Sequence, residues 1–178
     1  MPELPAAEAF WDEIGESLQP SALAVRFYEA WNGMRPAPAV LPGRQHIRME
    51  TITDLLPNVS MFDIEFVGGK LRLRRRLVGT ALVDAMGRDP TGEYLDDNSH
   101  HDPQSRSTMT ARAAKVFARK VPHWRLGPPL LKVYWHGGVP YVETVLAPLA
   151  TDGQTPDIIL SFALFLNETR QQTQPFKW

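Results

Sequence analysis

The chain has 178 residues, a formal net charge of −1 and no cysteine. This length is typical of one domain, and the lack of cysteine excludes disulfides, thiolate metal sites and cysteine nucleophiles. The chain opens without a signal-peptide pattern and contains no run of the roughly 18 apolar residues that a membrane span needs. We therefore expect a cytoplasmic protein that does not bind membranes.

Charge is unevenly distributed along the chain. Residues 1–66 carry a net charge of −6, residues 67–135 a net charge of +7, and residues 136–178 a net charge of −2. A basic block of this kind could bind an acidic partner or a polyanion. The balance of the whole chain favours neutralisation by the acidic N-terminal part instead, and we expect no binding to nucleic acid.

The first 33 residues predict a helical arm. Apolar side chains recur at helical spacing over residues 8–18 and again over residues 20–33. Both stripes contain aromatic residues and are too apolar to remain exposed together. We expect an interaction face made of Trp11, Phe27 and Trp31 that covers the outer face of a sheet, either within the chain or across a homodimer.

A β-hairpin follows a proline-rich connector at residues 34–43. Residues 60–67 and 71–77 alternate between apolar and charged side chains, and Gly68-Gly69 between them is a strong turn signal. The pattern therefore predicts two antiparallel strands, each with one apolar face.

Four arginines occupy the second strand of this hairpin. The alternation places Arg75 on one face together with the leucines of the strand, including Leu77. The side chains expected on the other face are those of Arg72, Arg74 and Arg76. Asp63 and Glu65 of the first strand point to the same side, so we expect carboxylate–guanidinium pairs across the hairpin.

The middle of the chain predicts short helical pieces and one longer helix. Residues 78–87 form a short apolar segment, and Asp89–Gly92 is a turn. Residues 107–121 have a helical pattern that places Phe117 on the buried face and Arg112 on the exposed face.

The last third of the chain predicts three strands. Residues 130–136 and 139–148 are expected to pair through a glycine turn, and residues 157–167 form the third strand. That third strand is apolar on both faces, which is typical of a central strand covered on both sides.

This order of elements resembles the PAS fold, and several motifs resemble a family of small stand-alone PAS-like proteins of alphaproteobacteria. The motifs are Tyr28-x-x-Trp31, Pro42-x-Arg44, Leu55-Leu56-Pro57, Arg76-Leu-Val-Gly-Thr80 and Gly87-Arg-Asp-Pro-Thr-Gly92 with Leu95. The resemblance covers about residues 25–166. It implies an α+β fold with a five-stranded antiparallel sheet in the order 2-1-5-4-3 and helices on one face. The implied division is a helical arm at 1–33, a PAS-like domain at 34–167 and a tail at 168–178.

The resemblance implies a sensory or regulatory module that binds a small molecule or a protein partner and has no catalysis of its own. The expected partners are a second copy of the chain, as a homodimer, and an unidentified signalling protein. The alternative is a cavity-forming α+β enzyme or carrier. Such proteins place an Asp–His pair inside the cavity, and no histidine of this chain falls in a predicted apolar strand or helix stripe.

In a PAS fold the second strand of the hairpin leads into short helices that cover a cavity on the sheet. The residues expected to line such a cavity are Thr80, Met86, Tyr94, Phe117, Tyr134 and Ser161. Methionine supplies an adaptable wall, while tyrosine and serine supply polar groups that orient a ligand. The opposite strand parity would replace Tyr134 by Trp135, and a close-packed core would leave no cavity at all.

Asp96–Asp102 (Asp-Asp-Asn-Ser-His-His-Asp) is the cluster with metal-ligand chemistry. Adjacent ligands rarely converge on one ion without a rigid frame, and the chain has no cysteine for a structural zinc site. We therefore expect no metal site, and we predict no cofactor apart from an unknown small ligand.

Overall fold

The computed structural model describes residues 6–97, 103–130, 141–167, 169, 171 and 172. One antiparallel sheet of six strands forms the centre of the molecule, in the order β1-β4-β5-β6-β2-β3. The strands are β1 (Ala7–Phe10), β2 (Val59–Val67), β3 (Lys70–Val78), β4 (His123–Gly127), β5 (Tyr141–Leu149) and β6 (Ile158–Leu166).

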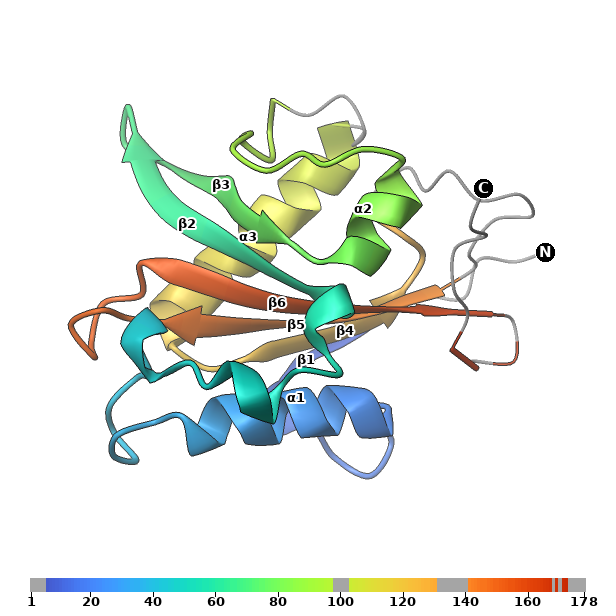
Figure 1. Cartoon of the computed structure of the whole chain (residues 1–178), viewed down its shortest axis with the longest axis horizontal. Helices are drawn as coiled ribbons and strands as arrows, with labels where there is room; N and C mark the ends of the chain where they lie inside the picture. The colour runs from blue at the N-terminus through green and yellow to red at the C-terminus, as the bar shows by residue number, and fades with distance from the viewer. Residues whose placement is uncertain (1–5, 98–102, 131–140, 168, 170, 173–178) are drawn as a thin grey trace.

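Helices cover both faces of the sheet (Figure 1). The helices α2 (Thr80–Met86) and α3 (Pro103–Arg119) lie on one face, which we call the inner face. The helix α1 (Ala22–Gly33) lies on the opposite, outer face. Short 3₁₀ turns occupy Trp11–Glu13, Arg44–His46, Met49–Thr51 and Leu56–Asn58. The expected α+β class is confirmed.

The strand order follows the expected PAS pattern and adds one strand. Counted from β2, the five strands β2 to β6 lie in the order 2-1-5-4-3, and β1 is added at the edge beside β4. The helix expected over residues 8–18 is therefore wrong. Its first part forms β1, in which Ala7 is paired with Leu126 and Phe10 with His123. This pairing satisfies the backbone of an otherwise open edge strand, which local helical spacing cannot reveal.

The aromatic side chains of α1 cover the outer face within the chain. The ring of Phe27 stacks on Phe162 of β6 at 5.4 Å between centroids, and Trp31 Nε1 donates to the carbonyl oxygen of Pro148 at 2.8 Å. Trp11 stacks on Tyr28 at 4.4 Å. The helix begins after Ser21, whose hydroxyl accepts a hydrogen bond from the amide of Ala24.

The β2–β3 hairpin is confirmed, but a β-bulge changes which residues of β3 face inward. Met61 is paired with Leu77 and Phe62 with Arg75, so Arg76 is the extra residue. The bulge reverses the alternation beyond it: Arg75 stays buried as expected, whereas Leu77 is 39% exposed instead of sharing its face.

The arginines on the exposed face of β3 are paired, although only one of them pairs as expected. Arg76 Nε lies 2.7 Å from Asp63. Arg74 Nε donates to the carbonyl oxygen of Gly92, while Glu65 accepts from the hydroxyl of Tyr94. Arg72 binds carboxylates outside the hairpin, described below with the groove that contains it.

The strand that pairs with β5 follows α3 directly. His123 is paired with Leu146 and Gly127 with Val142, so the described neighbour of β5 on this side is β4, which the sequence did not predict as a strand. Of the strand expected at residues 130–136, positions 131–136 lie outside the described residues. Alternation in β4 is hidden in the sequence because its inward positions carry His123 and Arg125 instead of apolar residues.

The chain leaves β3 through Gly79, which precedes α2. A Cβ at this position would overlap the carbonyl oxygens of Leu56 and Pro57, so the absence of a side chain allows the close approach. Strand β6 lies between β5 and β2 and is buried along its whole length, as its two apolar faces predict.

Candidate ligand-binding cavity

A cavity of about 70 Å³ lies between the inner face of the sheet and the helices α2 and α3. Its apolar lining comes from Phe62, Val78, Leu82, Met86, Met109, Leu130, Val142, Leu146 and Ala163. Its polar lining comes from Ser60, Thr144, Ser161, Arg75, Arg112 and Arg125. A mainly apolar wall with a few polar groups is typical of small-molecule sites.

The structure brings two of the candidate residues to this cavity, namely Met86 and Ser161. Three others lie elsewhere. Thr80 is exposed in the first turn of α2, Tyr94 contacts Glu65 and the Arg72 guanidinium, and Phe117 packs edge-on against Phe66. Tyr134 and its alternative Trp135 lie outside the described residues.

Arg112 is buried, which corrects the exposed position expected for it. Its side chain is 3% exposed. Nε donates to Nδ1 of His123 at 3.2 Å, and Nη1 donates to the hydroxyl of Thr144 at 2.9 Å. The helical spacing contained the signal, because Met109, Arg112 and Val116 fall on one stripe of α3. The positive charge of Arg112, taken by itself, predicts the opposite, exposed face of the helix.

The sequence pattern places no histidine in an apolar strand, whereas the structure buries His123 of β4 against Arg112. Its Nδ1 accepts a hydrogen bond from the guanidinium, so that nitrogen carries no proton. Burial and the positive charge of Arg112 lower the pKa of His123 to about 4. The imidazole is therefore neutral and acts as a hydrogen-bond acceptor for Arg112.

Two further arginines line the cavity from the sheet. Arg125 of β4 is 5% exposed, and its Nη1 donates to the carbonyl oxygen of Pro128 at 3.0 Å. Gly127 leaves room for this guanidinium, since a Cβ there would lie 2.8 Å from Arg125 Nη2. Arg75 of β3 is 4% exposed and lies over the ring of Phe62 at 5.7 Å.

The environment of these arginines disfavours their positive charge. Burial and, to a smaller extent, the charge of Arg125 lower the pKa of Arg112 to about 9. Burial also lowers the pKa of Arg75 to about 10 and shifts the pKa of Arg125 in the same direction. All three remain cationic at neutral pH, so the cavity is a desolvated site of positive charge.

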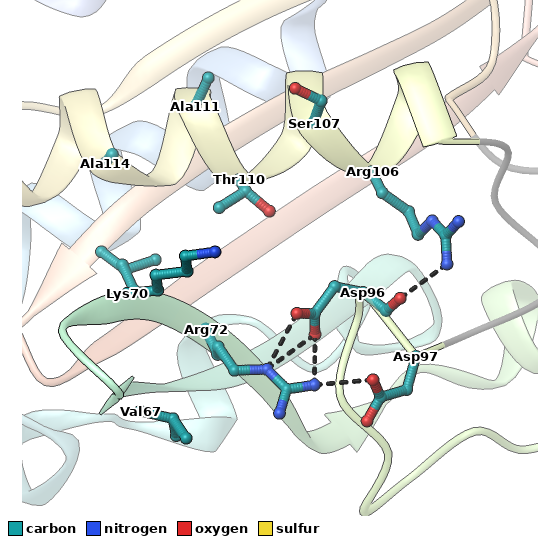
Figure 2. A pocket seen from close by; sticks show the side chains of 11 residues that line it. Val67, Lys70, Arg72, Asp96, Asp97, Arg106, Ser107, Thr110, Ala111 and Ala114 are labelled. Atoms are coloured by element: carbon teal, nitrogen blue, oxygen red, sulfur yellow. Dashed lines mark hydrogen bonds and ion pairs between the residues drawn. The ribbon is translucent and has the colours of Figure 1, made fainter.

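A larger, open groove of about 810 Å³ lies between β3 and α3 (Figure 2). Arg72 Nη2 lies 2.8 Å from a carboxylate oxygen of Asp96 and 2.8 Å from one of Asp97, and Arg106 donates to the backbone carbonyl of Asp96. Because these charged groups bind one another at the surface, the groove is a weaker candidate than the buried cavity.

The ion pairs with Arg72 involve the first two residues of the Asp96–Asp102 cluster. Asp96 and Asp97 face Arg72, and positions 98–102 lie outside the described residues. In the part of the chain that the structure describes, no three histidine or carboxylate side chains are grouped as metal ligands. Within the same residues, no helix combines the length and the apolar character needed to cross a membrane.

Two comparisons with known proteins give a match, and a third gives none. A family model described as a PAS domain matches residues 19–163. One similar solved structure is described as an RNA-binding light-oxygen-voltage receptor, with a TM-score of 0.46 and 14% sequence identity. The similarity covers 94% of this chain and 40% of the receptor chain, so this chain spans less than half of the receptor's length. No curated protein matches the chain.

Proposed function

The chain belongs to the PAS domain family, and from this premise we propose that it is a sensory or regulatory module that binds a small molecule in the inner-face cavity. The observation that carries the proposal is the cavity itself, in which buried polar groups converge among apolar side chains beneath α2 and α3. Its volume of about 70 Å³ favours a ligand of few atoms, because sites for drug-sized molecules measure roughly 300–1,000 Å³.

We propose binding without catalysis in this cavity. The alternative, a cavity-forming enzyme, requires a carboxylate that orients a histidine as a base. Here Nδ1 of His123 faces the guanidinium of Arg112, which lowers the basicity of the imidazole. The contact is suited to holding Arg112 in place, and it opposes proton abstraction by His123.

We propose that the bound state is transmitted by association with a protein, either a second copy of this chain or a signalling partner. The inner-face helices α2 and α3 would couple the cavity to such a partner, because Met86 and Met109 on them contribute to the cavity wall. A ligand that repacks these flexible side chains would shift the helices that carry them.

Native mass spectrometry of the protein purified from the cells that produce it tests the binding proposal. We expect the wild-type chain to retain a small molecule and the Ser161→Phe variant to lose it, because the added ring would fill the cavity. Thr80→Phe is the matched control, since Thr80 is exposed and lies outside the cavity lining.

The free energy of unfolding of the Ser161→Phe variant provides a second test of whether the cavity is open. A residue that enters open space should cost little, whereas overpacking of a filled core costs about 1–3 kcal/mol. Equal retention of the molecule by wild type and Ser161→Phe would contradict binding in this cavity. So would a large loss of stability in a Ser161→Phe variant whose wild-type parent retains nothing.

A further inference from the structure

We infer that the ligand of the inner-face cavity is a small oxyanion, bound through a carboxylate or phosphate group by the guanidinium groups of Arg112 and Arg125. This inference rests on the proposed function, because it names the chemical class of the ligand for the same cavity. Four observations support it: burial of the two cations, the neutral character of their contacts, their proximity, and the apolar remainder of the wall.

The hydrogen bonds that Arg112 makes with described residues all go to neutral acceptors. They are Nδ1 of His123, the hydroxyl of Thr144 and, at 3.4 Å, the carbonyl oxygen of His123. Arg125 likewise binds a backbone carbonyl, that of Pro128. Among the described residues, the ion pairs that arginines form involve Arg26, Arg72, Arg76, Arg88 and Arg119. No described carboxylate therefore forms an ion pair with Arg112 or Arg125, and the carboxylate whose charge reaches both is that of Glu8, which is paired with Arg125 across β1 and β4.

A buried cation that has no carboxylate in direct contact is costly unless another group completes its pairing. A guanidinium has five N–H donors in a fixed planar fork, and Arg112 directs three of its hydrogen bonds to the groups named above. The remaining donors can bind two oxygens of one anion, which is the geometry that carboxylates and phosphates provide.

The two cations line the same cavity. Arg125 of β4 is paired with Thr144 of β5, and Thr144 accepts a hydrogen bond from Arg112 of α3. The two guanidiniums therefore approach the same point of the sheet from the strand and from the helix above it. Their mutual repulsion, which contributes to the lowered pKa of Arg112, would be relieved by one anion bound between them.

The rest of the wall sets the character of the anion. Phe62, Met86 and Leu146 are among the apolar side chains that line it. A short hydrocarbon chain attached to a carboxylate would match this wall, whereas inorganic phosphate would use only the cationic end. The positive charge of the arginines can bind either an organic carboxylate or a phosphate group, and the experiment below distinguishes the two.

Thermal unfolding with defined probes tests the inference. The probes are sodium butyrate, inorganic phosphate and the neutral isostere butyramide, each compared with sodium chloride at equal ionic strength. We expect an anionic probe at 100 times its dissociation constant to raise the melting temperature by about 5–10 °C. A rise with butyrate alone assigns an organic carboxylate, and a rise with phosphate alone assigns a phosphate group.

Arginine variants show whether the cavity is the site. Arg112→Met and Arg125→Met remove one cation each while keeping an unbranched side chain, and both should abolish the rise. Arg106→Met is the matched control on the same helix, since Arg106 faces the open groove, and it should keep the wild-type response. If either cavity variant does not fold, NMR spectra of the wild-type protein provide the test instead. The guanidinium N–H signals of the buried arginines should then change their chemical shifts when the anion is added.

The possible outcomes distinguish a failure of the anion inference from a failure of the proposed function. Stabilisation by butyramide that equals the effect of butyrate and persists in Arg112→Met would overturn the anion inference and keep ligand binding in the cavity. An anion effect of equal size in wild type and both cavity variants, or arginine signals that do not move, would also overturn it. Failure of every probe, with no molecule retained in native mass spectrometry, would overturn the proposed function itself.

Discussion

At the scale of single residues, the inner face carries a contact between a cation and a neutral histidine. Arg112 donates to His123 from α3, and the rings of Phe10 and His123 form a T-shaped pair with centroids 5.0 Å apart. The burial of His123 keeps the imidazole neutral and orients Arg112 toward the cavity. The stability of the fold should therefore depend on the protonation of one histidine.

We expect the free energy of unfolding to fall as the pH falls from about 6.5 toward 4. The pKa of His123 is lowered to about 4 in the folded chain, whereas an unfolded histidine has a pKa of about 6.5. The unfolded state thus binds more protons in this window, and acidification favours it by up to about 1.4 kcal/mol per pH unit. Urea denaturation as a function of pH measures the effect.

His123→Gln is the matched variant, because its side-chain oxygen can accept from Arg112 but does not titrate. It should remove most of the slope between pH 6.5 and 5. The carboxylates whose pKa values are lowered, among them Asp96 and Glu13, lose their stabilising contribution only at lower pH. An unchanged slope in His123→Gln would show that another group controls this window.

At the scale of elements, the buried side chain of Glu143 connects β5 with β4 and with the start of α1. Glu143 of β5 is 1% exposed, and its Oε1 accepts from Trp124 Nε1 of β4 at 2.7 Å and from the amide of Ser21 at 2.8 Å. Ser21 is the cap of α1, so the carboxylate lies at the positive end of that helix dipole. Glu143 thereby fixes where α1 begins on the outer face.

Glu143→Ala should destabilise the fold by about 2–5 kcal/mol, because it leaves the buried Trp124 Nε1 and the half-buried amide of Ser21 without an acceptor. Glu143→Gln keeps one oxygen acceptor and should cost clearly less. Urea denaturation of the two variants gives the comparison. Equal stability of Glu143→Ala and wild type would show that water satisfies both donors and that α1 does not need this contact.

At the scale of the whole molecule, the sheet separates two layers of core. The outer layer holds Phe27, Trp31 and Trp124 against β5 and β6, while the inner layer holds Leu95, Val116 and Ile159 beneath α3. Both layers pack on the same central strands. Loss of the helices on either side would therefore expose an apolar face of the sheet to solvent. The family match begins at residue 19, which includes α1 but not β1.

Deletion of residues 1–33 should therefore cause aggregation or a strong loss of stability. Burial of Phe27 and Trp31 alone is worth about 1.5–3 kcal/mol each. Deletion of residues 1–18 is the matched control: it removes β1, keeps α1 and should leave a folded chain of lower melting temperature. Size-exclusion chromatography and thermal unfolding distinguish the two forms. A 1–33 deletion that melts like wild type would contradict the role of α1.

Local patterns in the sequence determined those elements whose stability is encoded by their own periodicity. Alternation with Gly68-Gly69 predicted the β2–β3 hairpin, the two apolar faces of residues 158–166 predicted the central strand, and the aromatic stripe predicted α1. The resemblance to the PAS fold added the order of five strands. The individual elements depend on contacts between residues that are close in the chain, and the strand order follows from the resemblance to the PAS fold. Both can therefore be predicted from the sequence.

Only the tertiary structure decided which polar residues are buried. Residues 8–10 form a strand because β4 offers an open edge, and His123 and Arg125 alternate inward because Trp124 packs on the opposite layer. The sequence predicts an exposed Arg112 because a positive charge normally stays in water. Its burial depends on His123 and Thr144, which follow it by 11 and 32 positions. The chemistry of the cavity is thus set by contacts between distant segments, which a local sequence pattern does not contain.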